Sequence, residues 1–98
     1  MPTIHGSWTP ETTFRPGAQV GATGQGGHTV LLDYAGGQYY GLDEVGTRIW
    51  ELVRDGQTLD GIVGALEAEY DVDRDVLQAD ASALLAELVA RRLVRTEG

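Results

Sequence analysis

The hydrophobic period of this sequence changes at Leu42–Asp43, and that change limits the possible folds more than any other feature. Before it, short apolar runs alternate with glycines; after it, apolar residues recur at helical spacing as far as Leu93. A block of strands followed by a block of helices predicts an α+β fold with an antiparallel sheet. The chain has 98 residues, which suffice for one small domain with a modest core.

Three strands are expected in the first block. Residues 18–22 form a weak first strand, 28–33 are rich in branched side chains and form a second, and 38–42 form the third. Glycine-rich segments at 23–27 and 34–37 join them, since glycine tolerates the dihedral angles that a chain reversal needs. We therefore expect a three-stranded antiparallel sheet.

Three helices are expected in the second block, each starting after a capping residue: Asp43, Thr58 and Asp73. The last helix is expected to run from Arg74 to Leu93. Each helix carries an apolar stripe for the core: Val45, Ile49, Leu52 and Val53; then Leu59, Ile62, Val63, Leu66 and Tyr70; then Leu77, Ala81, Leu84, Leu85 and Leu88. The links between the helices are short, so the helices pack as neighbours under one face of the sheet.

The N-terminal segment has a different composition. Residues 1–17 carry all three prolines, and we expect a flexible tail there, followed by the folded domain at 18–98. Trp8 and Phe14 either tether this tail to the domain or pack loosely, and the sequence leaves both readings open.

The charge balance argues against several partners. Seven arginines face fifteen acidic residues, which gives a net charge of −8 with histidine neutral. Such a chain repels a phosphate backbone, so no nucleic acid is expected as a partner. No apolar run approaches the ~20 residues that span a bilayer, and the first residues lack the pattern of a signal peptide. The expectation is a cytoplasmic protein without a membrane partner.

Catalytic and metal-binding patterns are weak. The chain has no cysteine and no lysine, and His5 and His28 lie far apart. The acidic run 71–75 lacks the glycine and glutamate of a calcium loop. Neither Ser7 nor Ser82 lies at a strand-to-helix elbow. We expect no enzyme activity, no metal and no cofactor, which leaves binding as the function.

The third expected strand is a candidate binding edge. Residues 38–42 carry neither the charge nor the proline with which proteins usually protect an edge strand. Tyr40 and Leu42 share one face, expected to be the inner one, while Tyr39 points to the other. Gly41 either admits the backbone of another chain or marks a twist or bulge. The alternative for the whole edge is that the last helix or the tail covers it.

The last helix offers a second candidate surface. Beside its core stripe runs a second stripe of mixed character, formed by Val76, Asp80, Ala83 and Glu87. Small residues flank this second stripe: Ala79, Ala86 and Ala90. A shallow trough between this helix and the sheet edge would receive alternate side chains of an added peptide, with Asp80 and Glu87 pairing with its basic residues. The alternative is that alanine only favours the helix and that Glu87 pairs with Arg91 as exposed neighbours.

Residues 30–93 resemble the PqqD-like family of leader-recognition elements for ribosomally made, modified peptides. The resemblance is carried by the following segments: Leu31-Leu32-Asp33, Tyr39-Tyr40-Gly41-Leu42-Asp43, Gly46 with Ile49-Trp50-Glu51-Leu52, Gly56-Gln57-Thr58, Glu69-Tyr70-Asp71-Val72, and Leu84, Leu85, Leu88 and Leu93. Arg15-Pro16-Gly17 before the first strand is most similar to the stand-alone members of lasso-peptide pathways. The chain departs from the family at Asp43, often Asn, and at Arg92, often Gly.

The resemblance implies a winged-helix-like fold and a function in peptide binding. The leader segment of a precursor peptide would pair antiparallel with the third strand and lie against the last helix, and the protein would deliver it to a separate, cysteine-type leader peptidase. Carried onto this sequence, the binding residues are Leu31, Gln38, Tyr39, Tyr40, Gly41, Leu42, Val76, Asp80, Ala83, Leu84 and Glu87. Two alternatives stay open: a PqqD-like chaperone for a different maturation enzyme, and a winged-helix DNA-binding regulator.

Overall fold

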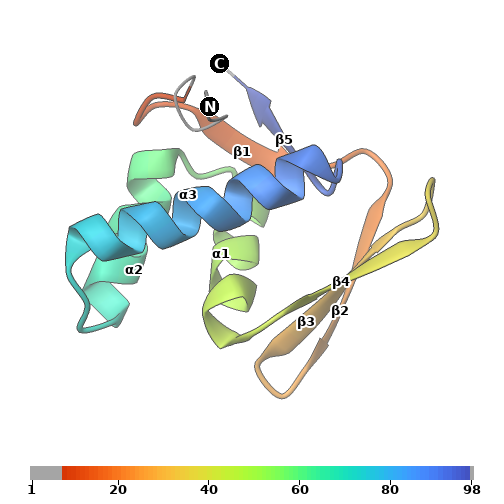
Figure 1. The fold of residues 1–98 in the computed structure, drawn as a ribbon, viewed down its shortest axis with the longest axis horizontal. Coiled ribbons are helices and arrows are strands. Elements are labelled where there is room, and N and C mark those ends of the chain that lie inside the picture. Colours follow the sequence, from red (N-terminus) through yellow and green to blue (C-terminus); the bar gives the residue numbers. More distant parts are fainter. Residues whose placement is uncertain (1–7, 98) are drawn as a thin grey trace.

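The computed structural model describes residues 8–97. Along the chain the elements are β1 (Thr13–Pro16), β2 (Val20–Gln25), β3 (His28–Asp33), β4 (Gln38–Leu42), α1 (Glu44–Arg54), α2 (Leu59–Glu69), α3 (Arg74–Ala90) and β5 (Val94–Glu97) (Figure 1). The predicted α+β fold, with a three-stranded antiparallel sheet followed by three helices, is confirmed. No helix within 8–97 is long and apolar enough to cross a membrane.

The three-stranded sheet has the order β2-β3-β4, with both pairs antiparallel. β3 and β4 have the bounds expected from the sequence, whereas β2 runs from Val20 to Gln25 instead of ending at Ala22. The reversal needs only Gly26 and Gly27, both at positive φ, so the preceding residues remain in the strand. The β2–β3 hairpin is therefore paired as far as Gln25 and His28.

Local capping chemistry sets the start of the first two helices. The Asp43 carboxylate accepts a hydrogen bond from the Gly46 N–H at 2.8 Å, and the Thr58 hydroxyl accepts one from the Gly61 N–H at 3.0 Å. Asp73 stands at the N-cap of α3 as expected, but its side chain makes no capping hydrogen bond. Two of the three predicted caps thus act through their side chains.

The end of α3 differs from the prediction. The helix stops at Ala90 instead of Leu93, because Arg92 takes a φ of 62° and turns the chain back. Leu93 and Val94 are buried, Leu93 from this turn and Val94 from the start of β5. The predicted helix end at Leu93 is therefore wrong, because the chain turns back after Ala90 and continues as a strand.

A second, two-stranded sheet was not expected. β1 pairs antiparallel with β5, so the prediction of little regular structure at 1–17 is wrong for Thr13–Pro16. Gly17 lies so close to Arg92 that a Cβ there would collide with the Arg92 carbonyl oxygen. Phe14 is fully buried and the Trp8 ring meets it edge-on at 4.8 Å between centroids, which supports the tethering reading. Residues 1–7 lie outside the described part, and the flexibility expected there stays a prediction.

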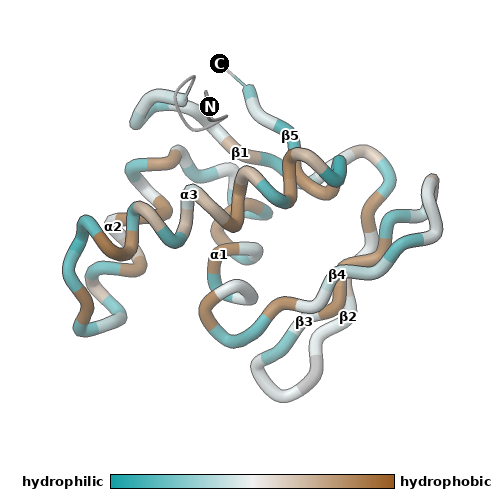
Figure 2. Tube along the Cα trace, viewed as in Figure 1, coloured by the Kyte–Doolittle hydropathy of each residue, from teal (hydrophilic) through white to brown (hydrophobic). Residues whose placement is uncertain are grey.

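The core lies where the helices meet the two sheets. α3 runs along the length of the molecule, α1 and α2 pack behind it, and the three-stranded sheet extends to one side (Figure 1). Hydrophobic positions recur along all three helices, alternating with hydrophilic ones (Figure 2). The predicted stripe residues Ile49, Ile62, Leu66, Leu85 and Leu88 are all buried in this one cluster. This arrangement leaves β4 at the rim of the helical layer.

Candidate functional site

The outer edge of β4 is unpaired within the described residues. β4 pairs with β3 on one side, and no strand among residues 8–97 pairs with its other side. In an antiparallel pair, part of the N–H and C=O groups of each strand point away from the partner, so this edge presents free donors and acceptors. The reading in which the tail pairs with this edge does not hold for β1, which pairs with β5.

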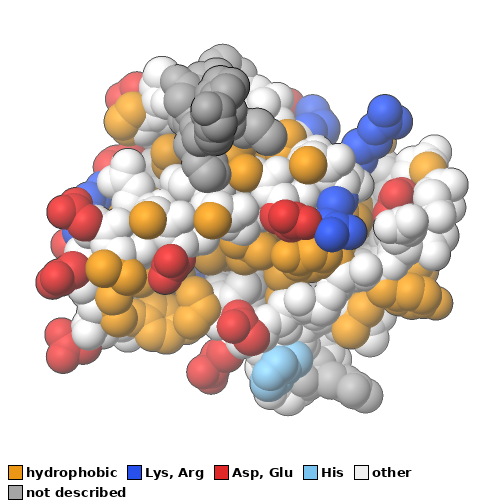
Figure 3. Space-filling view, in the orientation of Figure 1, with side chains coloured by type: hydrophobic (Ala, Val, Ile, Leu, Met, Phe, Trp, Pro, Cys, Tyr) orange, Lys and Arg blue, Asp and Glu red, His pale blue; other side chains and the backbone are white. Residues whose placement is uncertain are grey.

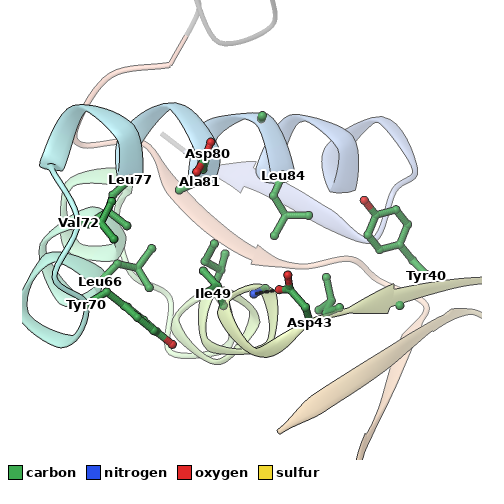
Figure 4. Close-up of a pocket in the computed structure, with 15 residues that line it drawn as sticks. Tyr40, Asp43, Ile49, Leu66, Tyr70, Val72, Leu77, Asp80, Ala81 and Leu84 are labelled. Atoms are coloured by element: carbon green, nitrogen blue, oxygen red, sulfur yellow. Dashed lines mark hydrogen bonds between the residues drawn. The ribbon is translucent and has the colours of Figure 1, made fainter.

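A cavity of about 620 Å³ lies beside this edge, between β4, the start of α1, the end of α2 and α3 (Figure 4). Tyr40 lies at one end and Tyr70 at the other, while Asp43 and Asp80 reach it from opposite walls (Figure 4). In the space-filling view, hydrophobic side chains form a band below α3 with acidic groups around it (Figure 3). The site is thus an apolar groove with an acidic border, parallel to an open strand edge.

Several residues predicted from the sequence line this cavity: Tyr40, Gly41, Leu42, Asp80, Ala83 and Leu84. They come from β4 and α3, the two elements between which a trough was expected. The pairing of these two elements across a groove therefore agrees with the sequence-based expectation.

The other predicted residues do not line the cavity. Leu31 lies opposite Tyr40 on β3, but its side chain is fully buried in the core. Tyr39 points to the far face of the sheet and is 72% exposed, as strand alternation requires. Val76 is exposed near the start of α3, and the Glu87 carboxylate bonds to Arg91. Gln38 lies at the free edge beyond the end of the cavity, so its contribution would be through its main chain.

Sequence reasoning missed the far wall of the groove. α1 and the end of α2 contribute residues that were assigned to the core or to a link: Val45, Gly46, Ile49, Leu66, Tyr70 and Val72. Helical periodicity identifies an apolar face but does not say whether that face is covered. One signal was available in the sequence: Val72 is an apolar residue between two acidic ones in a short link. In the structure its side chain is 44% exposed.

Arg91, just after α3, contacts the Tyr40 ring at one end of the groove. Its guanidinium lies 5.1 Å from the centroid of the Tyr40 ring, and it is held at 2.8 Å by the Glu87 carboxylate. A cation over an exposed aromatic ring contributes about 0.5–1 kcal/mol. The contact therefore helps to hold the Tyr40 ring against the end of α3.

All the charged side chains that line the groove in the described residues are acidic. Asp43 and Asp80 are its only charged lining residues among those described, and the Asp80 carboxylate forms no ion pair or side-chain hydrogen bond within 8–97. The Asp43 carboxylate is already engaged with the Gly46 N–H. The groove can therefore bury apolar side chains and still offer a carboxylate to a basic neighbour.

An ion pair ties α1 to the end of α2 below the groove. Arg48 donates to both Glu69 carboxylate oxygens, with Nε at 2.9 and 3.1 Å and Nη2 at 2.8 Å. This contact lowers the pKa of Glu69 below its ordinary value and raises the pKa of Arg48. Because Tyr70 follows Glu69 directly, the pair also helps to position one wall of the cavity.

The fold and the groove together define a small α+β domain with an open strand beside a helix, and comparison gives the family. Residues 28–94 match the profile of coenzyme PQQ synthesis protein D (PqqD), so the chain belongs to the PqqD family. The family resemblance stated from the sequence is confirmed.

Two solved structures are similar over most of their length. One is described as "TbiB1 in Complex with the TbiA(beta) Leader Peptide", with 36% identity, a TM-score of 0.79, and coverage of 83% of this chain and 94% of that one. The other is described as "Lasso peptide synthetase B1 complexed with the leader peptide", with 26% identity, a TM-score of 0.76, and coverage of 84% and 96%. No curated protein matches the chain.

Proposed function

We propose that this protein binds the leader segment of a precursor peptide in a lasso-peptide pathway. The observation that carries the proposal is the unpaired edge of β4 beside an apolar groove of about 620 Å³. Both similar solved structures are described as complexes with leader peptides, which supports the same class of ligand for this chain.

The leader binds by strand addition to β4. Its main chain runs antiparallel to Gln38–Leu42 and bonds to the free N–H and C=O groups of that edge. Every second side chain then faces inward between Tyr40 and Leu84, where the groove is apolar. A basic side chain at the border pairs with Asp80, which has no partner within the described chain.

The protein acts as an adaptor and not as an enzyme. It holds the leader and delivers the attached precursor to a separate cysteine-type leader peptidase, which raises the local concentration of the substrate. A ribosomally made precursor meets such an adaptor in the cytoplasm. A PqqD-like chaperone for a different maturation enzyme would bind its peptide by the same mechanism. The lasso pathway is favoured over this alternative because one similar structure is described as a lasso peptide synthetase B1. The acidic lining of the groove argues against the DNA-binding alternative.

Fluorescence anisotropy with a labelled leader peptide tests this proposal. The probes are the TbiA(β) leader and the leader of any precursor encoded beside this protein's gene, with a scrambled peptide as control. The strand variants are Tyr39→Pro and Tyr40→Pro, because proline removes a donor and distorts the edge. Thr23→Pro on β2, at the opposite edge of the same sheet, is the matched control.

We expect saturable binding by the wild type and by T23P, and loss of binding by at least one β4 variant that still shows a folded circular dichroism spectrum. Folded Y39P and Y40P proteins that bind the leader as tightly as the wild type would contradict strand addition. Failure of the wild type to bind any of these leaders would contradict the proposed function itself.

A further inference from the structure

Gly41 is a glycine that the fold of this chain does not require. The register of β3 with β4 is continuous on both sides of it, so there is no bulge. It is not among the glycines with positive φ, and a Cβ built on it would meet no atom within 4 Å. Glycine inside a strand is nevertheless less stable than alanine. The reason for glycine at this position therefore lies outside the chain.

The missing side chain belongs to the outer face of the sheet. Gly41 lies directly opposite Val30 and two residues after Tyr39, so all three share the face turned away from the helices. Val30 and Tyr39 are 44% and 72% exposed. With Leu32 they border a shallow hollow of about 390 Å³ on that face. Gly41 thus leaves an uncovered strip of backbone at the free edge of the sheet, next to the exposed apolar side chains of Val30 and Tyr39.

We propose that the bound leader places one large apolar side chain, aromatic or branched, on this outer face, across Gly41 and against Val30 and Tyr39. The inference rests on the proposed strand addition, which puts the leader beside Gly41. Cross-strand neighbours on one face lie about 4.5–5.5 Å apart at Cβ, and an aromatic side chain packs well over a glycine at a sheet edge.

The consequence is a leader that is recognised on both faces of β4. Inward side chains enter the groove beside α3, and one outward side chain covers Gly41. Two contacts on opposite faces fix the register of an added strand, because a shift by one residue exchanges its faces. The outer contact is therefore a specificity determinant in addition to the groove.

The test is Gly41→Val, measured with the same labelled leaders. Gly24→Val on β2 is the matched control, because a Cβ there would meet only the His28 carbonyl oxygen at an ordinary 3.8 Å. We expect G41V to be at least as thermally stable as the wild type and to bind the leader about fivefold or more weakly. G24V is expected to bind as the wild type does.

An alanine scan of the leader against both proteins locates the partner side chain. One large apolar leader residue should weaken binding when changed to alanine in the wild type, but not in G41V, which is the signature of coupled residues. Equal affinity of G41V and wild type would overturn the inference while leaving the proposed function intact. G41V could also bind every peptide of the alanine scan more weakly than the wild type by the same factor. That result would overturn the inference too, since Gly41 would then serve only the approach of the leader's backbone.

Discussion

At the scale of single residues, Asp43 combines a structural role with a place in the groove. Its carboxylate caps α1 through the Gly46 N–H at 2.8 Å, and it also lines the cavity. Asp43→Ala should lower the free energy of unfolding by about 1 kcal/mol, as loss of an N-cap usually does, whereas Asp43→Asn should retain most of the stability. Urea denaturation of the three proteins measures this.

The same pair of variants separates the cap from the charge. If D43N is as stable as the wild type but binds a basic leader more weakly, the carboxylate contributes electrostatically to the groove. An Asp43→Ala protein with unchanged stability would show that the capping hydrogen bond contributes nothing, and this account of where α1 begins would be wrong.

At the scale of elements, the ion pair between α1 and α2 makes stability depend on pH. Arg48 lowers the pKa of Glu69 in the folded protein below its ordinary value of 4.5. The stability from this pair is therefore fully present above pH ~4.5 and is lost as the pH falls through the folded-state pKa. The contribution is small because both side chains are a third or more exposed.

Glu69→Gln tests this expectation. The difference in urea midpoint between E69Q and wild type should be largest near pH 7 and should shrink as the pH falls below about 4.5 and Glu69 becomes protonated. Asp71→Asn, a nearby acidic residue for which no ion pair is seen within 8–97, serves as the control. A difference between E69Q and wild type that stays constant from pH 7 to pH 3 would contradict a charge-based role.

The pairing of β1 with β5 makes Phe14 a test of the unexpected second sheet. Phe14 is fully buried and contacts the Trp8 ring at 4.8 Å. Phe14→Ala should cost about 3–5 kcal/mol, a large part of the stability of a small domain. Urea denaturation checks this, with exposed Tyr34→Ala as the control. A loss below ~1 kcal/mol would mean that the N-terminal strand is not part of the core.

The elements that the sequence predicted well are those with local signals. Asp43 and Thr58 bond to backbone groups three residues away, and β3 and β4 are joined by a tight turn, so short windows contain the whole interaction. β1 was missed because its partner is far along the chain: Arg15 bonds to Glu97, 82 residues later. No local pattern distinguishes such a strand from a tail.

The same reasoning explains the site. The free β4 edge was predicted because the lack of charge and proline is visible within five residues. The wall formed by Ile49 and Leu66 was not, because an apolar helical face has the same sequence pattern whether it meets the core or a cavity. Tyr39 and Leu31 were assigned to the groove by family resemblance, although strand alternation alone already placed Tyr39 on the other face from Tyr40; the structure shows Tyr39 exposed on that face and Leu31 buried in the core.

At the scale of the whole molecule, ligand binding should be visible as a large change in thermal stability. A ligand that binds only the folded state stabilises it by about 2.7 kcal/mol at one hundred times its Kd. In a domain of this size, 98 residues, each kcal/mol shifts the Tm by about 4–8 °C. A saturating leader should therefore raise the Tm by about 10–20 °C, since β4 and the groove between α1, α2 and α3 are bridged by one added strand.

Differential scanning fluorimetry with Trp8 and Trp50 as intrinsic probes measures this shift over a range of leader concentrations. The shift should grow with the logarithm of the concentration above the Kd, be smaller for G41V than for G24V at equal leader, and vanish for the scrambled peptide. If anisotropy shows tight binding but the Tm does not move, the leader binds the unfolded chain as well as the folded one. The edge of β4, which exists only in the folded sheet, would then not be its binding site.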